Sequence, residues 1–205
     1  MTQINRPTSD MQPFRFRQQP PPDLTVLQIA GQRVILPAIH ERFAPEIFTE
    51  FNAEITRYMF PKPAETIDET LAFITDSLTK MRRRTDLVLA IAHREGEFLG
   101  CCGLHITQGH RTPELGIWLK QAAHGNGYGK EAIELLTTWA VANLEFEYAI
   151  YPVDKANIPS RKIPEALGGF VISEQKVEAM TGHVLDEVVY KIPYETLRAR
   201  HNSRA

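Results

Sequence analysis

The sequence predicts a single α/β (α+β) domain built on a mixed, mostly antiparallel central sheet flanked by helices. Three observations indicate this class: a run of three strand-like segments in mid-chain, a glycine-rich loop that opens a helix, and a strand–helix–strand order after that loop. The 205 residues suit one domain with short extensions. With 43% hydrophobic and 23% charged residues, the chain can bury a sizeable core.

The domain is expected to occupy residues 24–195. Residues 1–23 end in QQPPPD and show neither the helical nor the strand apolar period, so we expect a mobile N-terminal extension there. Residues 196–205 are expected to form a C-terminal tail.

The first half of the domain is expected to hold two strands, two helices and a hairpin. The second helix begins at Thr66, because Thr66-Ile-Asp-Glu69 forms a capping box and a helical apolar stripe follows it. The strands are expected at residues 24–30, 33–39, 87–94 and 98–107, and the first helix at 40–52.

The second half is expected to alternate strands and helices before a final hairpin. Gly168 follows the second of these helices as a C-terminal stop. The expected elements are a strand at 114–119, a helix at 130–144, a strand at 147–151, a helix at 157–167 and hairpin strands at 170–177 and 184–192.

Charge and cysteine content narrow the partners and the compartment. A formal net charge of -2 gives no sign of nucleic-acid binding, and the basic run at residues 80–84 is typical of a solvated helix end. Cys101 and Cys102 are neighbours in a strand-like run, so they point to opposite faces and do not form a mutual disulfide. Without a signal peptide or a long apolar segment, we expect a cytoplasmic protein with no membrane partner.

Residues 124–132, HGNGYGKEA, form a glycine-rich loop of the kind that holds phosphate at a helix N-terminus. A P-loop is excluded, because only three residues separate Gly125 from Gly129 and Lys130 is followed by Glu131 instead of Ser or Thr. A dinucleotide fingerprint is excluded too, because the third glycine comes one position early and the preceding strand belongs to a meander.

The remaining pattern is Q/R-x-x-G-x-G/A, with His124 in the usual Gln/Arg position. It resembles the acetyl-CoA loop of the GNAT N-acetyltransferase superfamily. The strand ELGIWL before the loop and NIPSRKIPEALGGF (residues 157–170) after it strengthen the likeness, and the latter, with ITRYM and REGEFLGCCGLHI, is similar to the ribosomal-protein-alanine acetyltransferase branch. The resemblance covers roughly residues 31–193, and it implies a GNAT-like fold.

The resemblance implies a set of acetyl-CoA-binding residues. Gly127 and Gly129 would let the backbone approach the pyrophosphate, with loop N–H groups directed at its oxygens and His124 facing the phosphates. Lys130 either adds charge there or faces solvent. The expected cofactor-binding residues are Ile117, Trp118, Leu119, His124, Gly125, Asn126, Gly127, Tyr128, Gly129, Lys130 and Asn157.

The resemblance also implies direct acetyl transfer to an amine, with no metal. Asn157 would bind the pantetheine arm, and Ser160 would meet the departing sulfur as an acid or hydrogen-bond donor. Alternatively, Asn157 caps the helix and Ser160 occupies its first turn. Pro164 lies inside this helix and can bend it.

A base must remove the amine proton, and Glu114 is best placed because it starts the strand that ends at the glycine loop. Glu174 and His105 are alternatives.

The sequence therefore predicts an N-acetyltransferase that uses acetyl-CoA as co-substrate. The acceptor is left open between a protein N-terminus, a polyamine or other small amine, and an aminoglycoside-like molecule. A non-catalytic acyl-CoA-binding sensor is the alternative function, and a homodimer is also left open.

Overall fold

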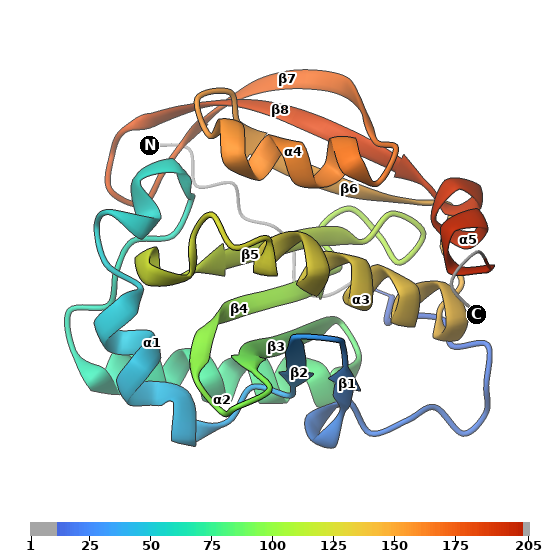
Figure 1. The fold of residues 1–205 in the computed structure, drawn as a ribbon, viewed down its shortest axis with the longest axis horizontal. Helices are drawn as coiled ribbons and strands as arrows, with labels where there is room; N and C mark the ends of the chain where they lie inside the picture. The colour runs from blue at the N-terminus through green and yellow to red at the C-terminus, as the bar shows by residue number, and fades with distance from the viewer. Residues whose placement is uncertain (1–11, 203–205) are drawn as a thin grey trace.

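The structure is a computed structural model that describes residues 12–202. One eight-stranded sheet runs through it in the order β1-β2-β3-β4-β5-β6-β8-β7, and only β5 and β6 are parallel neighbours (Figure 1). The predicted class is confirmed. The strands are β1 (Gln28–Ala30), β2 (Val34–Pro37), β3 (Asp86–His93), β4 (Phe98–His105), β5 (Glu114–Leu119), β6 (Tyr148–Asp154), β7 (Phe170–Glu178) and β8 (Val184–Pro193).

Helices cover both faces of the sheet. In Figure 1, α3 and α4 lie in front of the strands and α2 lies behind them. Side-chain direction agrees with this: Ile117 and Leu119 of β5 approach Gly129 of α3, whereas Trp118 between them contacts Phe51 after α1. The helices are α1 (Ala44–Glu50), α2 (Ile67–Arg83), α3 (Tyr128–Asn143), α4 (Ile158–Ala166) and α5 (Tyr194–Asn202).

The start of α2 confirms the predicted cap. Thr66 Oγ1 accepts a hydrogen bond from Glu69 N at 3.4 Å, and the Glu69 carboxylate accepts one from Glu65 N at 2.8 Å. These bonds satisfy N–H groups near a helix start that would otherwise lack partners. The helix then buries Ile74 and Met81 against the sheet.

Part of the expected N-terminal extension is packed against the domain. Phe14 and Phe16 are buried, Phe14 N donates to Arg84 O at 2.8 Å, and Arg17 N donates to Asn143 O at 2.9 Å. Two buried aromatic side chains therefore attach this part of the segment to the domain. Residues 1–11 of that extension lie outside the described residues.

Helix α5, Tyr194–Asn202, runs from the end of the expected domain into the expected C-terminal tail. Leu197 of this helix is buried, and Phe146 packs edge-on against Tyr194 with ring centroids 5.2 Å apart. One buried leucine and one aromatic contact fix the helix, and neither produces an apolar period in the sequence.

The sheet opens between β5 and β6. Six residue pairs join β5 to β4, but only Glu114↔Ile150 joins β5 to β6, so the two strands diverge beyond Glu114. Lys120 N donates to Leu99 O, which places the hydrogen-bonding groups of every second β5 residue toward β4. The backbone groups of Ile117 and Leu119 therefore face the opening.

Cys101 and Cys102 are both buried and free, as their neighbouring positions predict. No helix within residues 12–202 combines the length and apolar character that crossing a bilayer requires.

Candidate functional site

The glycine loop leads directly into α3 at the open end of β5. Gly125 and Gly127 have φ values of 77° and 76°, in the left-handed region that glycine adopts without strain. Gly127 is the N-cap of α3, so the N–H groups of Tyr128, Gly129 and Lys130 lie in its first turn without partners inside the helix. The positive end of the helix therefore faces the loop.

Gly129 lies where α3, β5 and α4 meet. A Cβ on this residue would lie 3.3 Å from Leu119 Cδ1 and 3.4 Å from Ile163 Cδ1. Its missing side chain therefore lets α3 pack closely against β5 and α4.

Arg33, on the turn before β2, adds a cation to the loop that the sequence did not reveal. Its Nη1 donates to Asn126 O at 3.0 Å, its Nε lies 2.8 Å from Glu131 Oε2, and its guanidinium lies over the Tyr128 ring at 5.1 Å. The chain offers no sequence signal for this contact, because Arg33 and Glu131 are 98 positions apart.

Glu131 follows Lys130 and would repel phosphate if its charge faced the loop. Burial raises the pKa of this carboxyl, but hydrogen bonds from the backbone and side chain of Arg33 and from Val34 N together lower it. The carboxylate is thus ionised but held against β2. Its charge is offset by the same arginine that reaches the loop.

Three other loop residues are placed as follows. His124 Nε2 lies 2.9 Å from Leu119 O, so the ring is bonded to β5. Asn126 Nδ2 donates to His124 O at 3.0 Å and helps to close the loop. Lys130 is exposed, with its Nζ 4.0 Å from Glu134 Oε1, which agrees with the solvent-facing alternative.

The start of α4 carries both residues expected there. Asn157 Oδ1 accepts from Ser160 N at 3.3 Å, so Asn157 caps the helix. Ser160 Oγ lies 2.8 Å from the hydroxyl of Tyr151, a β6 residue that is only 2% exposed. Burial raises the pKa of Tyr151 to about 12, although the bond with Ser160 lowers it. Tyr151 was missed because nothing in a strand sequence shows which hydroxyl will meet a helix.

The face of the sheet opposite α3 and α4 carries a row of three polar side chains. Asp86, His105 and Glu114 are successive cross-strand partners on β3, β4 and β5, so they share one face. His105 Nδ1 lies 3.3 Å from Asp86 Oδ1. Thr107 Oγ1 donates to Glu114 Oε2 at 2.8 Å. Two of the candidate bases therefore stand side by side.

Glu174, the other candidate base, is elsewhere. It lies on the exposed edge strand β7, and its carboxylate accepts from Lys155 Nζ at 2.7 Å. This ion pair leaves Glu174 on the rim of the sheet and away from the row.

Glu187 on β8 is a further carboxylate that the sequence did not single out. It is buried opposite Asp154 and accepts from Gln175 Nε2 at 2.8 Å. Burial raises the pKa of Glu187, and the charges of Glu114 and Asp154 raise it further. Negative charge therefore gathers on this side of the opening.

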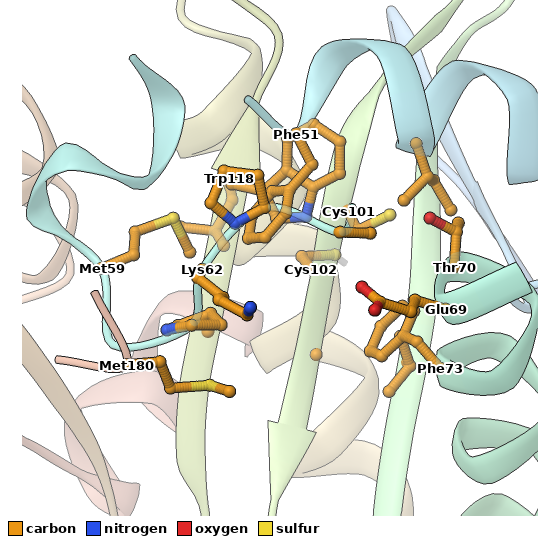
Figure 2. Close-up of a pocket in the computed structure, with 18 of the residues that line it drawn as sticks. Phe51, Met59, Lys62, Glu69, Thr70, Phe73, Cys101, Cys102, Trp118 and Met180 are labelled. Atoms are coloured by element: carbon orange, nitrogen blue, oxygen red, sulfur yellow. The ribbon is translucent and has the colours of Figure 1, made fainter. Parts of the chain in front are cut away.

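A pocket of about 430 Å³ lies on the same face, between the α1–α2 region and the strands β3 to β5 (Figure 2). Gly103 and Gly116 are cross-strand partners and line its floor beside Val88. A Cβ on Gly103 would lie 2.9 Å from His105 Nε2, and one on Gly116 would lie 3.4 Å from the same atom. The two glycines thus leave room for the imidazole at one end of the floor.

Within residues 12–202, no group of three or more His, Cys, Asp or Glu side chains could hold a metal ion. A metal-independent reaction remains an expectation from the resemblance.

The comparisons with known proteins agree with this geometry. A sequence model of the acetyltransferase (GNAT) domain matches residues 33–169, which include the glycine loop and all of β2 to α4. The chain belongs to the GNAT acetyltransferase family. No curated protein matches the chain by sequence.

Solved structures share the fold of this GNAT chain. Mycobacterium smegmatis RimJ in complex with CoA-disulfide has a TM-score of 0.74 at 17% identity, covering 86% of this chain and 96% of its own. A GCN5-related N-acetyltransferase from Brucella melitensis has a TM-score of 0.72 at 16% identity, with 91% and 89% covered. The microcin C7 self-immunity acetyltransferase MccE, solved with acetyl-CoA and AMP, has a TM-score of 0.72 at 19% identity. The match covers 83% of this chain and 99% of MccE.

The family and these neighbours confirm the predicted superfamily, and the neighbours include the ribosomal-protein acetyltransferases RimJ and RimL. The family match supports an acetyltransferase.

Proposed function

We propose that the protein is an N-acetyltransferase that moves the acetyl group of acetyl-CoA directly to a primary amine. The observation that carries the proposal is the opening between β5 and β6. The glycine loop and α4 lie on one side of it (Figure 1). The row of Asp86, His105 and Glu114 and the pocket lie on the other side. A thioester in this opening would be within reach of both faces.

The donor side would hold the coenzyme by its phosphates and its pantetheine arm. The N–H groups at the start of α3 would provide positive charge for the pyrophosphate. The Arg33 guanidinium reaches the same loop, with part of its charge offset by Glu131. The backbone groups of Ile117 and the N–H of Leu119, which face the opening, can bond the arm as another strand would, while Leu119 O is bonded to His124. His124 would support this by tying the loop to β5.

The reaction needs a neutral amine and a protonated leaving group. The amine nitrogen attacks the thioester carbonyl carbon, its proton passes to a base, and the carbon–sulfur bond then breaks. Ser160 would give a hydrogen bond or a proton to the departing sulfur. Tyr151, 2.8 Å away, would orient the serine hydroxyl.

Glu114 is the base we propose, because it lies at the one pair that joins β5 to β6. The amine would therefore meet Glu114 where the opening narrows. His105 remains the alternative, since its ring lines the pocket and is bonded to Asp86.

The sensor alternative is not favoured. A module that only binds acyl-CoA does not need the hydroxyl pair of Tyr151 and Ser160 and the polar row that includes Glu114 at one opening. The deciding experiment mixes the protein with acetyl-CoA and a panel of amines. We expect release of free CoA thiol together with an amine heavier by one acetyl group in mass spectrometry. Thiol without acetylated amine would mean hydrolysis, and neither product would mean a binding module.

A further inference from the structure

The walls of the pocket are almost wholly apolar. The rings of Phe51 and Trp118 meet at one end with centroids 4.9 Å apart. Figure 2 shows Met59 and Met180 on one side of the pocket and Phe73 on the other. Phe73 and Met180 remain 46% and 57% exposed, so apolar surface at the rim lacks a covering side chain.

The pocket has a polar end and an apolar end. Its floor runs along β5 from Gly116 to Trp118, and His105 lines the polar end. Glu114, the cross-strand partner of His105, lies just beyond that end, and at about 3.4 Å per residue it is about 14 Å from Trp118 along β5. Glu187 adds negative charge near Glu114. The aromatic pair lies at the other end. A ligand that fits both ends carries a cation at one end and an apolar body at the other.

The remaining charges of the pocket disfavour a second cation. Among its lining residues, all within the described part of the chain, the fully charged side chains are Lys62 and Glu69. Lys62 Nζ lies 2.5 Å from Glu65 Oε1 at the rim, and the Glu69 carboxylate is bonded to Glu65 N. A polycation would therefore meet one carboxylate, Glu69, and otherwise a paired lysine and aromatic carbon, where it needs several carboxylates.

We infer that the acceptor is a compact primary amine that carries one bulky apolar group, as arylalkylamines do. This inference rests on the proposed function and narrows its acceptor. The amine would lie beside Glu114 and His105, where its nitrogen can attack the thioester, and the apolar group would fill the space between Phe73 and Trp118. Burial of the apolar group then provides most of the discrimination between amines.

Binding and turnover are both needed to test the inference. The binding measurement is calorimetry of 2-phenylethylamine, ethylamine and spermidine against the CoA-bound protein, which needs no reaction. The turnover measurement compares kcat/KM for the same amines, kanamycin and a short peptide with N-terminal serine. We expect 2-phenylethylamine to bind and to react at least about tenfold better than each of the others.

A matched pair of variants on α2 tests the location. Phe73→Ala removes an exposed pocket wall, and Ile67→Ala removes a similarly exposed side chain, at 38%, outside the pocket. Phe73→Ala should lower kcat/KM for 2-phenylethylamine about tenfold and leave ethylamine unchanged. Ile67→Ala should change neither.

The outcomes separate the inference from the proposed function. Spermidine, kanamycin or the peptide equal to or better than 2-phenylethylamine would overturn the inference and leave the acetyltransferase proposal standing. No acetylated product from any amine would overturn the proposed function. In that case, tight binding of 2-phenylethylamine that Phe73→Ala weakens would still support the ligand class, and equal binding of all three amines would overturn it.

Discussion

Glu114 and His105 face each other across β4 and β5, so replacing each one separately identifies the base. In Glu114→Gln the side chain keeps its shape and loses its proton acceptor. We expect turnover to fall near neutral pH and to recover partly as pH rises, because more of an amine with a pKa of about 10.4 then arrives neutral. The measurement is the pH dependence of kcat/KM.

His105→Gln is the comparison for that experiment. If His105 is the base, this variant shows the neutral-pH loss and Glu114→Gln keeps the wild-type profile. Acetyl-CoA should raise the melting temperature of both variants, because neither residue lies on the donor side.

Ser160 and Tyr151 form a hydroxyl pair whose role is chemical if the proposal is right. Ser160→Ala should lower kcat on the order of tenfold to a thousandfold, the range for one lost proton donor or stabilising hydrogen bond. Acetyl-CoA affinity should stay within about threefold, since the coenzyme is held mainly by the loop. Equal kcat in variant and wild type would mean that Ser160 has only a structural role in the first turn of α4.

Tyr151 also makes a prediction about stability at high pH. Its pKa is about 12 in the folded protein and about 10 when unfolded, so the folded state holds this proton more tightly. Its stabilising contribution is therefore complete below pH 10 and is lost as pH rises from 10 to 12. Tyr151→Phe lacks this loss. Urea unfolding should show that the free energy of unfolding of the wild type falls by up to about 3 kcal/mol relative to that of the variant across this pH range. The same dependence of this free energy on pH in both proteins would contradict the prediction.

At the scale of elements, the loop before α3 depends on the backbone of Gly127. Valine at this position would oppose a φ of 76° and place a side chain over the loop. We expect acetyl-CoA to raise the melting temperature of wild type but not of Gly127→Val. Gly182→Val is the control, because Gly182 has a φ of 85° in the turn between β7 and β8, with open space around it. A full shift in Gly127→Val would place the coenzyme elsewhere.

The sequence predicts elements well where an apolar period or a turn residue marks them. Strand β5 has the expected bounds, and the Thr66 cap is confirmed. Helix α5 was missed, because a single buried leucine, Leu197, fixes it and gives no period. The strand expected at 24–30 is shorter, since residues Leu24–Val26 form a turn of 3-10 helix.

The candidate site was predictable only where its residues are neighbours in the chain. The loop motif and the pair Asn157 and Ser160 lie within short segments, so their spacing carried information. Arg33 reaches Asn126 from 93 positions away, and Tyr151 reaches Ser160 across a strand–helix contact. Such contacts are set by the packing of whole elements, which spacing along the chain does not encode.

At the scale of the whole molecule, residues 12–23 bind the domain from outside the sheet. Phe14→Ala should remove a buried ring and lower the free energy of unfolding by about 3 kcal/mol. For a domain of this size, the melting temperature should fall by roughly 6–12 °C. Val26→Ala, which truncates a side chain that is 76% exposed, is the control and should change it little. Equal melting temperatures in all three proteins would show that the segment contributes no stability.

The opening between β5 and β6 also divides the work of the molecule between separate stretches of chain. Donor-side groups come mainly from residues 115–163, whereas the pocket walls come largely from residues 47–73 and from Met180. The two sets meet on β5 at residues 116–118, which line the floor of the pocket. During evolution, such a chain can exchange one acceptor for another by changing a helix pair and a hairpin tip, while the coenzyme site is inherited unchanged.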